Sequence, residues 1–237
     1  MGVAGDGAWS MIEAVGQAAL DASGPEEAMR ILARGSFDLL GDRDVHLTGG
    51  ALLAGQHQFF VAGTFFVTPD KRYHMLVGST GFPPEQERLL VPIDGGHPGW
   101  VYAHRAKLIL KNTDDHGEFK QYLKSARMGS AIFAPIIWKG EFLGQLIMAA
   151  QARHTMRDAD LEVIVALARV ATGAWVAHGG PAWLAADCAA GTSVPDPFLA
   201  DMKWIGGRIV GGQPRRAAVR DPRAGGHARK RADHLER

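Results

Sequence analysis

Apolar side chains recur every three or four positions in two stretches near the N-terminus, which predicts two amphipathic helices. The first stretch runs from Trp9 to Ala22. The second begins at Pro25, a residue suited to the first position of a helix, and ends at Gly35 or continues to Leu40. We expect both helices to turn one apolar stripe toward a shared core.

A third helical stretch starts near Thr155 and stops before Gly179. Thr155 and Asp158 have the spacing of a capping box at its start. Apolar side chains cover nearly its whole circumference, so we expect it to be buried on two sides. Its main stripe consists of Leu161, Ile164, Leu167, Ala168, Ala171 and Trp175.

Two pairs of segments rich in β-branched and aromatic residues predict two β-hairpins. The first pairs Phe59–Val67 with Tyr73–Ser79 across a proline-containing turn. The second pairs Ser130–Trp138 with Glu141–Ala150 across a two-residue Lys-Gly turn. Proline cannot donate to a strand ladder, so Pro135 is expected at a sheet edge or a bulge.

The segments between these elements carry weaker patterns. Asp42–Gln58 is rich in glycine and predicts a loop with room for a short helix. Pro98–His104 predicts a short helix, Lys107–Leu110 a short strand, and His116–Lys124 a helix capped by the polar residues before it.

This order of elements predicts an α+β fold with a central antiparallel sheet and helices packed on its faces, because the strands come in antiparallel pairs. We divide the chain into an N-terminal helix (1–24), a main domain (25–178), an irregular apolar segment (179–207) and a basic disordered tail (208–237). From position 208 onward nine basic residues face three acidic ones.

Composition changes this picture little. The chain has 237 residues, 46% of them hydrophobic, and a net charge of +1. Because the tail carries +6, the rest of the chain carries −5. Cys188 is the only cysteine, so no intramolecular disulfide can form. The sequence shows neither a signal peptide nor a long uninterrupted apolar run, so we expect a cytoplasmic protein without a membrane span.

Five segments in this order resemble the GAF domain family, over about residues 25–178. They are Leu76–Phe82, Gly99–Val101 with Lys107–Leu110, Ser130–Ile136, Lys139–Leu146 and Arg157–Leu161. The resemblance implies a small-molecule pocket formed by the sheet, the short helices and the long connection between them. Carried over to this chain, eight residues would line or approach that pocket: His74, His97, Trp100, Tyr102, His116, Phe119, Tyr122 and Ser130.

The residues themselves offer little for catalysis. GAF-like free methionine sulfoxide reductases need a nucleophilic thiol, and bilin-binding relatives attach their pigment through a cysteine inside the domain, whereas Cys188 lies beyond it. The sequence shows no glycine-rich phosphate loop, no paired catalytic carboxylates and no close histidine pair that would indicate a metal site. We therefore expect no enzyme; haem or metal binding through His97 or His116 stays open as a minor alternative.

Two functional hypotheses follow. The first is a non-enzymatic sensor or regulatory module that binds an unidentified small molecule and signals through the helices of a homodimer to a partner. The second is an accessory or assembly subunit without a ligand, which docks onto a larger complex through Pro181–Ile205. The basic tail lacks interleaved aromatic residues and nucleic-acid-binding motifs, so we do not expect nucleic acid as a partner.

Overall fold

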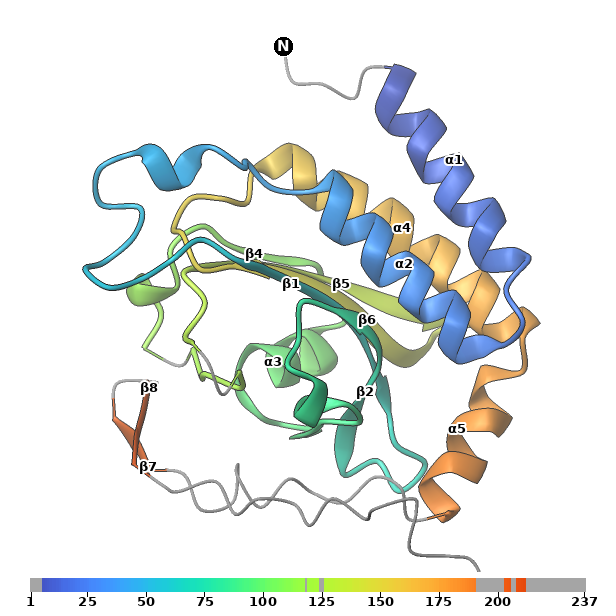
Figure 1. The fold of residues 1–237 in the computed structure, drawn as a ribbon. Coiled ribbons are helices and arrows are strands. Elements are labelled where there is room, and N and C mark those ends of the chain that lie inside the picture. The colour runs from blue at the N-terminus through green and yellow to red at the C-terminus, as the bar shows by residue number, and fades with distance from the viewer. Residues whose placement is uncertain (1–5, 118, 124–125, 191–202, 206–207, 212–237) are drawn as a thin grey trace, which may run out of the picture.

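A six-stranded antiparallel sheet lies at the centre of the molecule (Figure 1). The computed structural model describes residues 6–117, 119–123, 126–190, 203–205 and 208–211. The strand order is β3-β2-β1-β6-β5-β4, and every neighbouring pair is antiparallel. The strands are β1 (Phe60–Val67), β2 (Tyr73–Thr80), β3 (Leu90–Pro92), β4 (Leu108–Leu110), β5 (Ser130–Trp138) and β6 (Glu141–Ala150).

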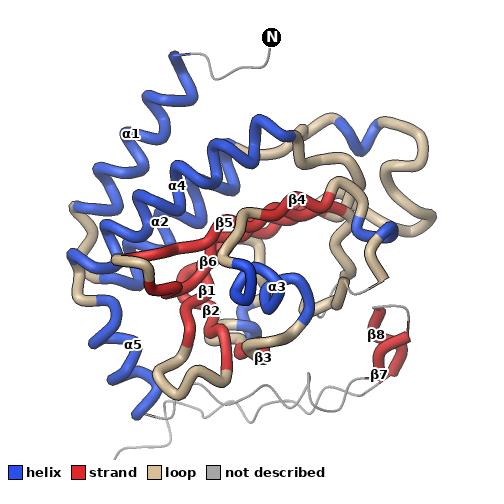
Figure 2. The backbone as a smooth tube through the Cα atoms, turned by 180° about the vertical axis from the view of Figure 1, so that it is seen from behind, coloured by secondary structure: helices blue, strands red, loops and turns tan. Residues whose placement is uncertain are grey.

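Three helices form two layers on one face of this sheet. Helices α2 (Pro25–Leu39) and α4 (Asp158–Ala177) pack on the strands, and α1 (Asp6–Leu20) lies outside them against both helices (Figure 1). The short helix α3 (Gly96–His104) covers part of the opposite face, which Figure 2 shows from behind. The predicted fold class, with helices on both faces of an antiparallel sheet, is confirmed.

The central strands are buried on both sides because their side chains alternate between two apolar cores. Phe66, Met75 and Leu146 point toward α2 and α4 and belong to the larger core. Val61 and Phe133 point to the other face and belong to a second core under α3. Such strands read as continuous apolar runs, so the sequence does not show which residue faces which core.

Two glycines allow backbone segments to approach closely. Gly78 has a φ of 72°, and a Cβ atom there would lie 2.6 Å from the backbone nitrogen of Arg30 in α2. A Cβ atom on Gly144 would lie 2.2 Å from the carbonyl oxygen of Phe65 in the neighbouring strand. Both positions therefore require glycine for packing.

Most predicted elements are confirmed to within two or three residues, and both hairpins have the predicted pairing. The turn between β5 and β6 has positive φ angles at Lys139 and Gly140, as a two-residue hairpin turn requires. The loop after α2 contains the short 3₁₀ helix η1 (Val45–Leu47).

The predicted helix His116–Lys124 is wrong. The side chain of Asn112 instead caps the 3₁₀ turn η3 (Thr113–Asp115), and the described residues that follow it form no helix. The carbonyl oxygen of Tyr122 accepts a hydrogen bond from Gln86 Nε2 at 2.7 Å, a distant partner in place of an intrahelical one. Tertiary contacts thus override the helical spacing of the apolar residues.

The predicted capping box at Thr155 is also wrong, because α4 begins at Asp158. The Thr155 hydroxyl donates to the Ala152 carbonyl oxygen instead, at 2.9 Å. Asp160 Oδ2 accepts from the backbone nitrogen of Arg157 at 2.8 Å, so the true box lies two residues later.

The described part of the segment 179–207 contains regular elements, whereas the sequence predicts an irregular segment. Helix α5 (Gly180–Ala189) follows α4 directly, with Pro181 in its first turn. Two short strands, β7 (Lys203–Ile205) and β8 (Arg208–Gly211), pair with each other, so the expected disordered tail begins with a strand. Residues 191–202, 206–207 and 212–237 lie outside the described part of the chain.

No single helix among the described residues has both the length and the hydropathy to cross a membrane. Helices α4 and α5 meet that criterion only when taken together, and they are bent by 71° relative to each other.

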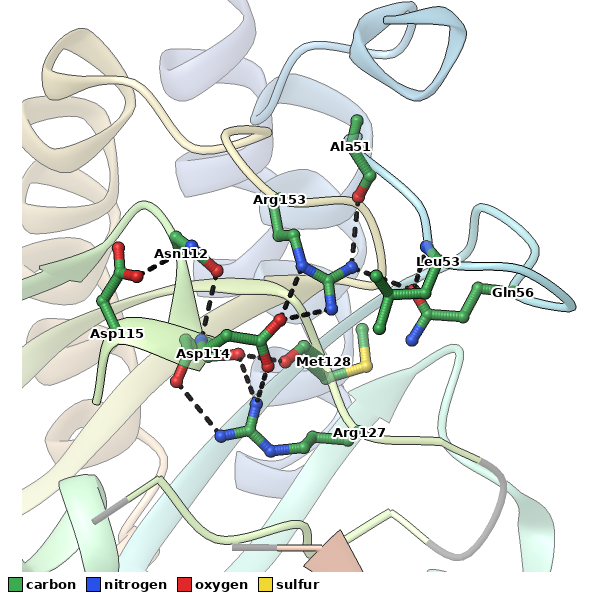
Figure 3. A network of polar contacts seen from close by, with 10 residues as sticks. Ala51, Leu53, Gln56, Asn112, Asp114, Asp115, Arg127, Met128 and Arg153 are labelled. Atoms are coloured by element: carbon green, nitrogen blue, oxygen red, sulfur yellow. Dashed lines mark hydrogen bonds and ion pairs between the residues drawn. The ribbon is translucent and has the colours of Figure 1, made fainter. Parts of the chain in front are cut away.

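An ion network of two buried arginines and a partly exposed aspartate joins the connections at one end of the sheet (Figure 3). Asp114 lies between two arginines: its Oδ1 accepts from Arg127 Nη1 at 3.0 Å and its Oδ2 from Arg153 Nε at 2.7 Å. Arg153 also bonds the Gln56 side chain, in the loop before β1, at 2.9 Å. Arg127 also lies over the ring of Phe119, 4.9 Å from its centroid. One carboxylate thus joins three connections that are far apart in the sequence.

We expect Asp114→Asn to lower the free energy of unfolding by about 1–2 kcal/mol, because it removes a negative charge that hydrogen-bonds two buried guanidinium groups while itself being partly exposed to solvent. Asp115→Asn is the matched control: this exposed carboxylate accepts a hydrogen bond from the Asn112 side chain at 3.1 Å and contacts neither arginine in Figure 3, so its loss should cost less than about 0.5 kcal/mol. Urea denaturation of both variants measures the difference. Equal stabilities would contradict a structural role for the network.

Candidate functional site

A cavity lies on the sheet face opposite α2 and α4. The centre of a water-sized sphere can move through ≈ 60 Å³ of it, several times the roughly 10–15 Å³ that one water molecule needs. We call the described residues 119–123 and 126–128, most of which line the cavity on the side away from the sheet, the strap. The described lining residues are Val61, Phe65, Phe82, Val91, His97, Pro98, Phe119, Lys120, Gln121, Tyr122, Leu123, Ala126, Met128, Ala131, Phe133, Ile147 and Ala149.

The floor of the cavity follows from strand alternation. Val61 on β1, Ala131 and Phe133 on β5, and Ile147 and Ala149 on β6 occupy alternate positions that face away from α2 and α4. Alanine at two of these positions leaves space that larger side chains would fill. The floor is therefore apolar, and it is fixed by the most regular part of the fold.

His97 is the histidine in the cavity wall. It lies in the first turn of α3, is 9% exposed, and its ring centroid lies 5.6 Å from that of His116 and 5.5 Å from that of Phe119. Burial, with smaller contributions from the nearby His116 and Arg127, lowers the pKa of His97 to about 4. The imidazole is therefore neutral at pH 7, and its buried Nδ1 has no hydrogen-bond partner within the described residues.

Tyr122 belongs to the strap and is held at both its side chain and its backbone. Its hydroxyl lies against the turn before α3, where a Cβ atom on Gly95 would come within 2.8 Å of it. Burial raises the pKa of the Tyr122 phenol, and Asp94 raises it further. Its carbonyl oxygen accepts the bond from Gln86 described above. Tyr122 is thus a neutral, largely buried wall of the cavity.

The structure brings together only part of the predicted site. His97, Phe119 and Tyr122 line the cavity, and His116 contacts His97 from an exposed position beside it. His74 and Tyr102 contact each other, with ring centroids 5.7 Å apart, but neither lines the cavity.

Trp100 and Ser130 do not lie where the resemblance placed them. Trp100 is 40% exposed on α3 and stacks on His104. Ser130 points to the helix face of the sheet, where its Oγ accepts from the backbone nitrogen of Met156 at 3.2 Å. Strand alternation explains the error, because Ala131, the next residue, is the one that faces the cavity.

Most of the missed wall residues are aliphatic or aromatic residues of the sheet and the strap. Phe65, Ile147 and Ala149 could have been found by assigning each strand a cavity face and a helix face. Because these strands are apolar on both faces, the sequence gives no signal for that assignment. Met128 lies outside any regular element, so its position depends on the path of the strap.

The described residues can be searched for a metal site and for a thiol near the cavity. Within the described part of the chain, no three histidine, cysteine, aspartate or glutamate side chains cluster to hold a metal ion. Cys188 lies on α5 in a separate groove with residues of the β1–β2 turn, including Thr68 and Asp70. It is not among the described lining residues of the cavity.

Buried neutral histidines should make stability depend on pH. Burial lowers the pKa of His74 to about 4, against about 6.5 for an exposed histidine. The unfolded chain therefore binds more protons between pH 6.5 and 4, so stability falls as the pH falls through this window. His74→Phe should flatten this fall by up to about 1.4 kcal/mol per pH unit in urea titrations at pH 7, 5.5 and 4.5. An unchanged slope would show that His74 does not titrate in this way.

Several solved structures share this architecture. A GAF domain from an Acinetobacter phosphoenolpyruvate-protein phosphotransferase matches with a TM-score of 0.60 and 14% identity, over 78% of this chain and 96% of that chain. Free methionine-R-sulfoxide reductase from Neisseria meningitidis, in complex with its substrate, matches with a TM-score of 0.57 and 15% identity, over 76% and 96%. Residues 122 to 287 of a methyl-accepting chemotaxis protein match with a TM-score of 0.52 and 19% identity, over 68% and 94%.

At these identities the structural likeness shows the fold alone, because sensors and an enzyme share it. No curated protein matches the sequence. The family model for the GAF domain matches residues 25–175, which is more than half of the chain and agrees with the segments quoted from the sequence. The chain therefore belongs to the GAF domain family.

Proposed function

We propose that this chain is a non-enzymatic sensor or regulatory module that binds a small molecule in the cavity under the strap. GAF domains are a family of small-molecule-binding sensory and regulatory domains. The observation that carries the proposal is the cavity itself, an apolar space lined by His97, whose buried Nδ1 has no hydrogen-bond partner among the described residues. A largely apolar ligand with one hydrogen-bonding group fits such a wall.

The position of Cys188 supports a non-enzymatic role. Reduction of a sulfoxide by a GAF-like reductase needs a thiolate that attacks the bound substrate. The only thiol of this sequence lies on α5, in a groove beside the β1–β2 turn, and not in the cavity wall. Among the described wall residues the titratable side chains are His97, Lys120 and Tyr122, which offer a ligand hydrogen bonds and no nucleophilic thiol.

A homodimer through α1 fits the outer layer of helices. Trp9 and Leu20 of α1 are 56% and 50% exposed, and eleven residues, about three turns, place them on the same flank of the helix. The inner side of α1 is used within the domain, where a Cβ atom on Gly35 would lie 2.7 Å from Val15. We propose that the outer side meets a second copy, so that ligand binding can favour one arrangement of the helices over another.

The alternative, an accessory subunit that docks through Pro181–Ile205, receives less support. Leu184 is 5% exposed, and the ring of Trp183 lies 6.0 Å from that of Trp175. Two of the apolar residues that suggested a docking segment therefore pack against the chain's own domain.

Native mass spectrometry of the full-length protein tests the ligand proposal. We expect the purified protein to carry a retained small molecule, and Ala149→Leu to abolish its retention, because the added carbon atoms occupy the cavity. Ala103→Leu, on the exposed side of α3, is the control and should retain the molecule. Bare protein mass in every species, or retention that survives Ala149→Leu, would contradict the proposal.

Sedimentation analysis tests the dimer. Leu20→Glu places a charge on the exposed flank of α1 that also carries Trp9 and should weaken self-association by tenfold or more, since burying an unpaired charge at an interface costs several kcal/mol. Leu47→Glu is the control, because Leu47 lies in the η1 turn and is 76% exposed. A wild-type protein that sediments as a monomer, or a Leu20→Glu variant that stays dimeric, would contradict this interface.

A further inference from the structure

The connection between β2 and β3 contacts both the cavity and α5. It contains the 3₁₀ helix η2 (Pro84–Gln86) and then reaches β3 at Leu90. Strand β3 is an edge strand, so this connection can touch elements on both faces of the sheet. Gln86 makes the contact with the cavity wall, at Tyr122, and Arg88 makes the contact with α5, at Asp187.

Gln86 holds the strap. Its side chain is 1% exposed, and its Nε2 donates to the carbonyl oxygen of Tyr122 at 2.7 Å. A buried hydrogen bond of this kind is costly to lose without a replacement, because the carbonyl oxygen would remain buried without it. The position of Tyr122 in the cavity wall and the position of η2 therefore depend on each other.

Arg88 holds α5. Its guanidinium donates to both carboxylate oxygens of Glu26 in α2, at 3.0 and 2.8 Å, and forms an ion pair with Asp187 of α5 at 3.3 Å. It also lies over the ring of Trp183, 5.0 Å from the ring centroid. Arg88 has a φ of 58°, so its backbone is in the left-handed region, where side chains other than glycine are uncommon. Its pose thus depends on the local fold of the connection.

The other contacts of α5 are with the end of α4. Leu184 is buried, Trp183 meets the edge of Trp175, and a Cβ atom on Gly180 would lie 2.2 Å from the Trp175 ring. Helix α5 lies beyond residues 25–175, to which the GAF family model matches. Arg88 thus lies within the matched region and attaches to a helix that lies outside it.

We propose that Gln86 and Arg88 couple the cavity to α5, so that a ligand that displaces Tyr122 loosens α5 from the domain. This inference rests on the proposed function and assigns its output. When Tyr122 moves, its bond to Gln86 breaks or pulls on η2, and Arg88, two residues later, loses the pose in which it binds Glu26 and Asp187. Helix α5 is then released toward a partner. Linkage makes the effect reciprocal, so a docked α5 favours the closed strap.

Hydrogen exchange of the full-length protein tests the coupling without any added ligand, because the substitutions break the bonds of the coupling directly. Gln86→Met removes the bond to Tyr122 and keeps the side-chain volume. We expect amide exchange in Gly180–Ala189 to accelerate about five-fold, the factor for the loss of one buried hydrogen bond of about 1 kcal/mol. Arg88→Met removes the ion pairs directly and should accelerate the same amides at least as much.

Gln145→Met is the matched control. Gln145 is also a fully buried glutamine, on β6, and its Nε2 donates to the Pro98 carbonyl oxygen at 3.2 Å, away from η2. It should leave the exchange of α5 unchanged. The coupling is wrong if Arg88→Met accelerates α5 while Gln86→Met does not, or if Gln145→Met accelerates it equally. Failure of this test with a retained ligand in the native mass spectrum would remove the output route alone and leave the sensor proposal standing.

Discussion

The central sheet is apolar on both faces, and each face must be covered by a different part of the chain. Phe66 and Leu146 on one side and Val61 and Phe133 on the other are all buried. Helices α2 and α4 cover the first face with regular, closely packed layers (Figure 1). The second face receives one short helix and long connections, which cannot fill the space as evenly. The cavity is the consequence of this unequal covering.

Connections without regular structure need hydrogen bonds from side chains, because their backbone groups are not paired within a helix or strand. Asp114 holds one end of the strap through the buried Arg127, and Gln86 holds its middle through the Tyr122 carbonyl oxygen. These bonds hold a segment that has no helix or strand of its own. A region held by a few polar contacts can also open at a lower cost than a packed core, which a binding site must be able to do.

The helices and strands could be predicted from the sequence, but the path of the connections that cover the second face of the sheet could not. The hairpins were predictable because their strand composition and the Lys-Gly turn agree on one pairing. The first part of the strap was predicted as a helix because its apolar residues have helical spacing. Its path depends instead on side-chain bonds, one from Gln86, 36 residues before Tyr122, and one between Asp114 and Arg127. Three of the eight predicted site residues line the cavity; Ser130 failed because a doubly buried strand hides its facing.

The central claim is that an apolar cavity under the strap admits a ligand, and a crystal structure determined under xenon pressure tests it most directly. Xenon enters apolar protein cavities without needing polar partners. We expect a xenon atom in contact with Val61, Phe133 and Ile147, between the sheet and the strap. Side chains that fill this space, or xenon bound only elsewhere in the crystal, would contradict the claim.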